Sequence, residues 1–163
     1  MGRERIDLSI TLGADDFANY QKWHFVDEEI FPVCSPKFLH NNPLPDLQAL
    51  VNSPLLLLEE RYAPRMDWQE WLAHFNLRLP RKPQLFRFND YSIVLQAAIE
   101  GQGVAQGWRH IVQPLMAQGL LVRPLQHSVT TDQPLFITAP QGKVLRADVA
   151  FLKDWLVSEA ANT

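Results

Sequence analysis

The side chains that most often carry chemistry are present in this sequence, but their spacing does not assemble a catalytic set. Five histidines are scattered along the 163 residues, and none falls into a metal-ligand spacing such as HExxH. Ser35 and Ser92 lack the GxSxG context of a nucleophile. Adjacent carboxylates on a strand point to opposite faces and make poor acid–base partners; the acidic pairs are Asp15-Asp16, Glu28-Glu29 and Glu59-Glu60. We therefore expect no enzyme activity, no metal site and no cofactor.

The segment from Phe88 to Trp108, FNDYSIVLQAAIEGQGVAQGW, carries the densest structural signals. Asn89 and Asp90 have short polar side chains that can accept from free backbone N–H groups at a helix start. An apolar stripe at helical spacing follows, made of Tyr91, Val94, Leu95, Ala98 and Ile99. Gly101 is suited to end that helix, and the next residues are typical of a short strand. With residues 84–88 as a preceding strand, the unit predicts strand, helix, glycine turn and strand.

A helix that begins at the end of a strand directs unpaired N–H groups into the crevice above the sheet. Open α/β folds bind ligands in that crevice. A well-capped helix that only packs against the sheet, with glycines in a tight turn, explains the same spacing. Ligand binding and packing therefore both stay open as interpretations here. Gly101, Gly103 and Gly107 do not form a dinucleotide loop, because they follow the helix instead of joining a strand to it.

Composition narrows the class of protein. The hydrophobic fraction of 47% and the charged fraction of 20% are ordinary for a globular protein with a real core. The net charge of −3 gives no general basic field for nucleic acid, so we expect no DNA binding by this chain itself. The single cysteine, Cys34, excludes an internal disulfide and should be a buried, inert thiol. The longest apolar runs are only a few residues, which predicts no membrane span, no secretory signal and a cytoplasmic location.

Strand and helix patterns alternate along the chain, which predicts an α/β sheet protein. Strands or extended segments are expected at 6–12, 23–33, 55–58, 84–88, 103–105, 120–125 and 135–138. Helices are expected at 36–39, 43–51, 66–75, 111–118 and 146–160, besides the one after Asp90. Ser35 could cap the first of these helices, and Pro32 predicts that its strand lies at a sheet edge or ends there.

Five motifs in this order resemble the C-terminal effector-binding domain of LysR-type transcriptional regulators. They are DLSI at 7–10, FPVCSP at 31–36, LQAAIEGQGVA at 95–105, GLLV at 119–122 and FLKDWLVSE at 151–159. Ser9 stands where the family usually has alanine. The GQGVA wording is similar to the branch typified by regulators of glycine cleavage. The run GWRH at 107–110 departs from that branch and is similar to regulators of choline-sulfate use. This similarity implies that Trp108 would face a quaternary ammonium group.

The resemblance implies an α/β fold of two lobes, like type 2 periplasmic binding proteins, with mixed sheets and the effector in the cleft. Residues 29–129 would form lobe II, and residues 1–28 and 130–163 an incomplete lobe I. The helix-turn-helix DNA-binding domain, the linker helix and the opening strand and helix of lobe I would be absent from this chain. The implied effector-binding residues are Thr11, Gly13, Ser35, Asn89, Asp90, Tyr91, Ser92, Trp108 and Thr138.

We expect an effector-sensing domain that binds a small molecule and thereby modulates DNA binding by the absent domain. The effector would be an amino acid, a quaternary ammonium compound or a small carboxylate. Asp90 would oppose an anion unless its carboxylate is used for capping. The chain would form a homodimer or a larger homo-oligomer and would reach DNA only through the missing domain. The alternative is a stand-alone small-molecule binding protein of the periplasmic type.

Overall fold

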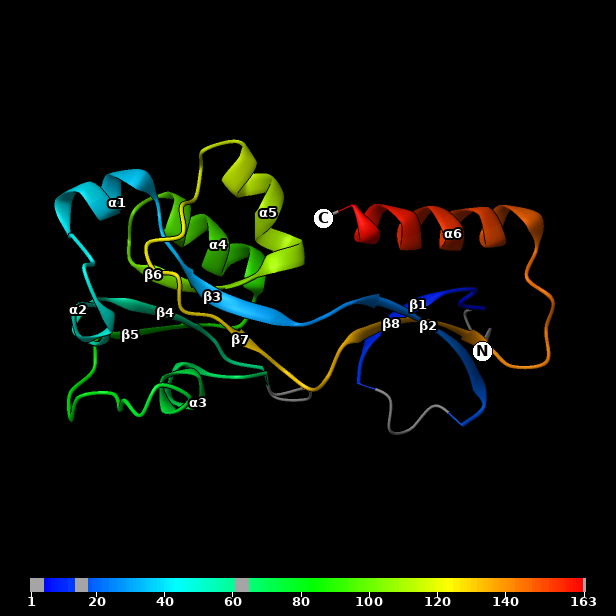
Figure 1. Cartoon of the computed structure of the whole chain (residues 1–163), viewed down its shortest axis with the longest axis horizontal. Coiled ribbons are helices and arrows are strands. Elements are labelled where there is room, and N and C mark those ends of the chain that lie inside the picture. The colour runs from blue at the N-terminus through cyan, green and yellow to red at the C-terminus, as the bar shows by residue number, and fades with distance from the viewer. Residues whose placement is uncertain (1–4, 14–17, 61–64, 163) are drawn as a thin grey trace. The chain divides into compact units, whose positions relative to one another are not determined.

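The computed structural model describes residues 5–13, 18–60 and 65–162, which form two compact units. Unit 1 is built from the described residues up to Glu28 and from Thr130 onward, and unit 2 spans Glu29–Val129. Both units combine helices with strands (Figure 1). The mixed α/β class predicted from the sequence is therefore confirmed. In the described ranges, no helix is both long enough and apolar enough to cross a membrane.

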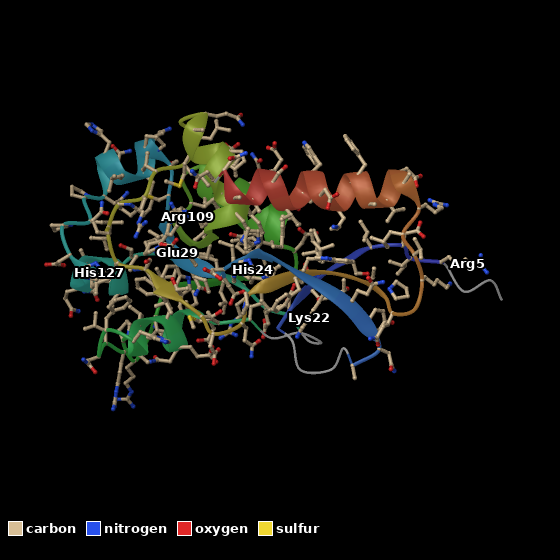
Figure 2. The ribbon with its side chains drawn as sticks, turned by 45° about the vertical axis from the view of Figure 1, so that its right-hand side comes forward. Arg5, Lys22, His24, Glu29, Arg109 and His127 are labelled. Carbon is tan, nitrogen blue, oxygen red and sulfur yellow. The ribbon has the colours of Figure 1, made fainter. Side chains whose placement is uncertain are left out.

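Unit 1 is a three-stranded antiparallel sheet with one long helix. Its strands are β1 (Ser9–Leu12), β2 (Tyr20–Val26) and β8 (Leu135–Pro140), in the order β1-β8-β2. Helix α6 (Ala147–Ala161) packs against β2, where the Lys153 ammonium lies 4.8 Å from the ring centroid of Trp23. Lys22 and His24 alternate with Trp23 and project from the opposite face of β2 (Figure 2).

Unit 2 is a five-stranded mixed sheet covered on both faces. The strand order is β5 (Leu85–Phe88), β4 (Leu55–Leu58), β6 (Val104–Trp108), β3 (Glu29–Val33) and β7 (Val129–Thr130). Strand β4 runs parallel to β5 and β6, whereas β3 is antiparallel to β6. The helices are α1 (Pro36–Asn41), α2 (Leu47–Val51), α3 (Trp68–Ala73), α4 (Tyr91–Ile99) and α5 (Arg109–Ala117).

The core of unit 2 explains its nearly continuous apolar strands. Alternate residues of β4 pack to opposite sides: Leu55 and Leu57 face α3, while Leu56 faces α4 and α5. Figure 1 shows α4 and α5 on one face of this sheet and α3 on the other. Both buried indoles of α3 donate across the layer boundary, Trp68 to the Leu56 carbonyl at 2.9 Å and Trp71 to the Ile30 carbonyl at 3.0 Å. Helix α3 is therefore fixed to the sheet by hydrogen bonds as well as by apolar burial.

Short polar side chains set where the helices of unit 2 begin. The side chains of Ser35, Asp46, Asp67 and Asp90 each accept from a backbone N–H in the first turn of α1, α2, α3 and α4 respectively. Gly101 takes a φ of +81° after α4, the left-handed conformation that favours glycine. The capping roles predicted for Ser35 and Asp90, and the helix end predicted at Gly101, are confirmed.

Two predicted elements differ from the observed secondary structure by more than their exact ends, and one observed strand was not predicted. The predicted strand at 120–125 is wrong: this segment makes one isolated bridge, between Val122 and Cys34. The predicted extended segment at 23–33 is two strands, since β2 ends at Val26 and β3 begins at Glu29. Strand β7 was not predicted, because two residues are too few for a periodic pattern.

Pro32 lies one residue before the end of β3, in agreement with the second predicted alternative, while β3 itself lies between β6 and the two-residue β7 and not at a free edge. Cys34 exchanges backbone hydrogen bonds with Val122, so Pro32, two residues earlier, turns its nitrogen to the same side, away from β6. Proline therefore costs the β3–β6 ladder no donor. Cys34 is buried as expected, and burial raises the pKa of its thiol to about 11.

Candidate functional site

The carboxyl ends of β4, β5 and β6 meet at one edge of the unit 2 sheet. From β4 the chain passes through α3 to β5 on one side, and from β5 through α4 to β6 on the other side of β4 (Figure 1). The direction in which successive strands are added therefore reverses between β4 and β6. In open α/β sheets, the crevice at such a reversal is where ligands bind. We treat this edge as the candidate site.

Strands β4 and β6 separate as they approach this edge. Their pairing covers only Leu55 with Val104 and Leu56 with Ala105, whereas the pairing of β4 with β5 continues to Leu58 and Phe88. The phenol of Tyr91 occupies the split: it donates to the Gln106 carbonyl at 2.9 Å and accepts from the Trp108 N–H at 3.2 Å. A side-chain hydroxyl thus bonds to two backbone groups of β6 beyond the point where its pairing with β4 ends.

The half-buried Tyr91 and the buried Trp108 lie together beneath this edge. Their rings meet edge to face with centroids 4.9 Å apart, and Trp108 is only 2% exposed. Burial raises the pKa of the Tyr91 phenol above its usual value, partly offset by the hydrogen bond from Trp108 and the charge of Arg65. The Arg65 guanidinium lies 5.4 Å from the centroid of the Trp108 ring. The indole therefore already has a protein cation beside it.

The start of α4 is capped by its own side chains. Asp90 accepts from the backbone N–H of Ser92 at 2.8 Å and also from the Ser92 hydroxyl. These two hydrogen bonds lower the pKa of the Asp90 carboxyl, which is fully exposed. The Asp90 carboxylate thus caps α4. We expected Asp90 to oppose an anion at this helix start only if its carboxylate did not serve as the cap. Asn89 is exposed immediately before it.

The remaining predicted site residues lie elsewhere. Ser35, in unit 2, is buried, and its hydroxyl accepts from the Phe38 N–H at 3.0 Å as the cap of α1. In unit 1, Thr138 pairs with Ser9 in the β1–β8 ladder, and its hydroxyl lies 3.5 Å from the Ser9 carbonyl. Thr11 is on the same strand as Ser9, and Gly13 follows with its N–H donating to the Pro134 carbonyl at 3.0 Å. Only the residues from Asn89 to Ser92 and Trp108 are therefore brought together at the unit 2 edge.

Three residues at the edge were missed by the sequence reasoning. Gln106 is 4% exposed, and its Nε2 has no hydrogen-bond partner in the described part of the chain. His110 Nδ1 is also buried and unpartnered among the described residues, and the pKa of His110 is lowered first by burial and then by the charge of Arg65. Arg65 is the third. A glutamine in the otherwise small and apolar run GVAQGW was the available signal.

The neighbouring charges belong to a separate ion-pair cluster. Arg109, the first residue of α5, points toward Glu29 (Figure 2), with 2.6 Å between Nη1 and Oε2. Arg123 lies 4.0 Å from the same carboxylate. Arg109 is thereby held to β3, and no side chain caps the start of α5 among the described interactions. No group of three metal-binding side chains occurs in the described residues.

The fold is that of an open α/β domain whose unit 2 sheet has a topological switch point at this edge, between β4 and β6. The family model for the LysR substrate binding domain matches residues 2–161. The chain therefore belongs to the LysR substrate-binding domain family, as the motif order predicted.

Named relatives agree with this assignment. The chain is 32% identical to the HTH-type transcriptional regulator DsdC of Escherichia coli K12, over 99% of this chain and 53% of that protein. It is 27% identical to the glycine cleavage system transcriptional activator of the same strain, over 96% of this chain and 50% of that protein. The chain thus spans about half the length of these relatives.

Solved structures confirm the fold. The AmpR effector-binding domain from Citrobacter freundii superposes with a TM-score of 0.74 at 21% identity, covering 97% of this chain and 76% of that one. The AmpR effector domain of Pseudomonas aeruginosa gives a TM-score of 0.73 at 20% identity, covering 96% and 73%. The two-lobe, periplasmic-binding-protein-like architecture predicted from the sequence is the fold of these neighbours.

Proposed function

We propose that this chain is the effector-sensing part of a LysR-type transcriptional regulator, which binds a small molecule and thereby changes DNA binding by the regulator. The family match over nearly the whole chain carries this proposal. The relatives are named as transcriptional regulators, which favours regulation over catalysis. The regulator would act in the cytoplasm as a homo-oligomer, with DNA contacts supplied by a helix-turn-helix domain.

The proposed binding surface on unit 2 is the edge formed by residues 89–92 and by Trp108. The switch between β4 and β6 supports this placement on geometric grounds. In unit 1, Thr11, Gly13 and Thr138 are proposed as further ligand contacts. Ser35 is not proposed as one, because its buried hydroxyl caps α1 at the other end of the unit 2 sheet. We assign residues 29–129 to lobe II, and residues 1–28 and 130–163 to part of lobe I.

Within the three effector classes, the contacts favour a carboxylate or an amino acid over a quaternary ammonium compound. A quaternary ammonium ligand needs an open aromatic face, but Trp108 is 2% exposed and lies beside the Arg65 guanidinium. The full-length regulator LysG of Corynebacterium glutamicum is described with arginine bound as effector. Its TM-score of 0.62 at 13% identity supports only that this fold accommodates an amino acid.

Thermal unfolding of this chain with a panel of amino acids, small carboxylates and choline-type cations tests the proposal. A ligand at about one hundred times its dissociation constant adds about 2.7 kcal/mol if it binds only the folded state. For a chain of this size, that stabilisation raises the melting temperature by about 5–10 °C. Failure of every compound to raise it would contradict effector binding by this chain.

The rival, a stand-alone binding protein of the periplasmic type, predicts the same ligand response but no effect on DNA. An electrophoretic mobility assay separates the two, using the full reading frame that contains this chain and the DNA upstream of it. A retarded band whose mobility or affinity changes with the effector supports the regulator. Ligand binding with no DNA retardation supports the rival.

A further inference from the structure

We propose that Arg65, Gln106 and His110 form a carboxylate subsite at the split between β4 and β6, which selects a carboxylate-bearing effector. This inference rests on the proposed effector-binding function and deepens it. The three residues come from three different segments: the connection after β4, strand β6 and the first turn of α5. None of them belongs to the set implied by the family resemblance.

Gln106 and Trp108 share a face of β6, because side chains alternate along a strand. Arg65 lies over the Trp108 ring, and its charge acts on both Tyr91 and His110. The guanidinium, the glutamine amide and the imidazole therefore approach the same end of β6. This is also the place where the pairing of β4 with β6 has ended and the Tyr91 phenol bonds to β6.

The hydrogen-bonding groups gathered here are mainly donors. The guanidinium carries only N–H donors, and the unpartnered atom of Gln106 is the amide nitrogen. No side chain of the described residues caps the first turn of α5, so its N–H groups add to the donor character. The Glu60 carboxylate lies 3.9 Å from the Arg65 guanidinium. A carboxylate fits this set because its two oxygens accept several hydrogen bonds at once.

A buried donor without a partner destabilises the folded protein, and buried polar groups are nearly always satisfied. The Gln106 amide nitrogen is in this state, and the His110 ring nitrogen Nδ1, four positions further along, is also buried without a hydrogen-bond partner in the described chain. Proteins retain such local violations mostly at functional sites. A bound carboxylate would satisfy the glutamine amide that the chain itself leaves unpartnered.

The test combines stability without ligand and binding of defined probes. Gln106→Leu removes the unpartnered amide at similar volume, and Gln113→Leu makes the same change on the exposed side of α5 as the matched control. We expect Gln106→Leu to keep or raise the melting temperature of the unliganded chain, by up to about 4 °C. A glutamine that serves only the structure would give the opposite result, a melting temperature below that of the control.

The probes are alanine with alaninamide, and propionate with propionamide, with choline as a cation that has no carboxylate. Binding is followed through the His110 ring signals by nuclear magnetic resonance, assigned with His110→Asn. We expect the carboxylates to bind at least about tenfold more tightly than the amides, and Gln106→Leu to lose about tenfold or more of that affinity. The Gln113→Leu control should bind like the unaltered chain.

The outcomes separate this inference from the proposed function. If compounds of the wider panel bind while Gln106→Leu leaves their affinities unchanged, the subsite is wrong and effector binding stands. Tighter binding of choline than of any carboxylate overturns the subsite in the same way. If none of the carboxylate probes binds, the carboxylate class is wrong, and the thermal panel then decides whether the chain binds an effector at all.

Discussion

Removing the hydroxyl of Tyr91 should destabilise unit 2 far more than the loss of one oxygen atom suggests. In Tyr91→Phe the ring still packs edge to face on Trp108, but the Gln106 carbonyl and the Trp108 N–H both lose their partner. Each buried backbone group left without a hydrogen bond costs about 1–3 kcal/mol. We expect a loss of about 2–4 kcal/mol in the free energy of unfolding, measured by urea denaturation with tryptophan fluorescence.

The control is Tyr20→Phe, which makes the same change on an exposed residue of β2 and should cost less than about 0.5 kcal/mol. Amide hydrogen exchange gives a local readout, since the Trp108 N–H should exchange faster in Tyr91→Phe. A loss below about 0.5 kcal/mol, with unchanged protection of the Trp108 N–H, would refute the claim that Tyr91 completes the separated ladder.

Three further predictions concern pH, thiol reactivity and packing. Folding lowers the pKa of His110, so the stability that this residue contributes is present above its ordinary pKa of about 6.5 and should fall as the pH drops below that value. His110→Asn should flatten this part of a pH titration of the melting temperature. Cys34, whose thiol pKa is raised to about 11, should react with a thiol reagent at pH 8 only as fast as the chain unfolds, and rapid labelling would contradict its burial. Gly103→Ala should cost about 1–3 kcal/mol in urea denaturation, because the added Cβ would lie 2.6 Å from the Pro54 carbonyl oxygen; an unchanged midpoint would show that this close approach is not rigid.

Local signals in the sequence predicted most of the fold. The caps at Ser35 and Asp90 and the turn at Gly101 were predictable because each depends on a residue's own chemistry within one helical turn. The segment 120–125 was not: its apolar residues resemble a strand, but Leu121 fills the core on the α4 side while Val122 makes only one bridge. Tertiary packing, which the local pattern does not contain, decided that segment.

The site was less predictable than the fold. The position of residues 89–92 at the sheet edge followed from the order of strand and helix. The binding of the Tyr91 hydroxyl to β6 did not, because it depends on where β4 and β6 separate, and no local pattern records that separation. Arg65 and Trp108 are 43 positions apart, so their contact likewise arises only from the fold.

The central claim, that this chain binds a small effector at the carboxyl edge of unit 2, is tested most directly by chemical-shift mapping. Backbone amide spectra of the chain would be recorded with and without the compound that most raises its melting temperature. The account predicts that the largest shifts fall on residues 89–92 and 106–110. Shifts confined to other parts of unit 2, or no shifts with a compound that binds, would contradict it.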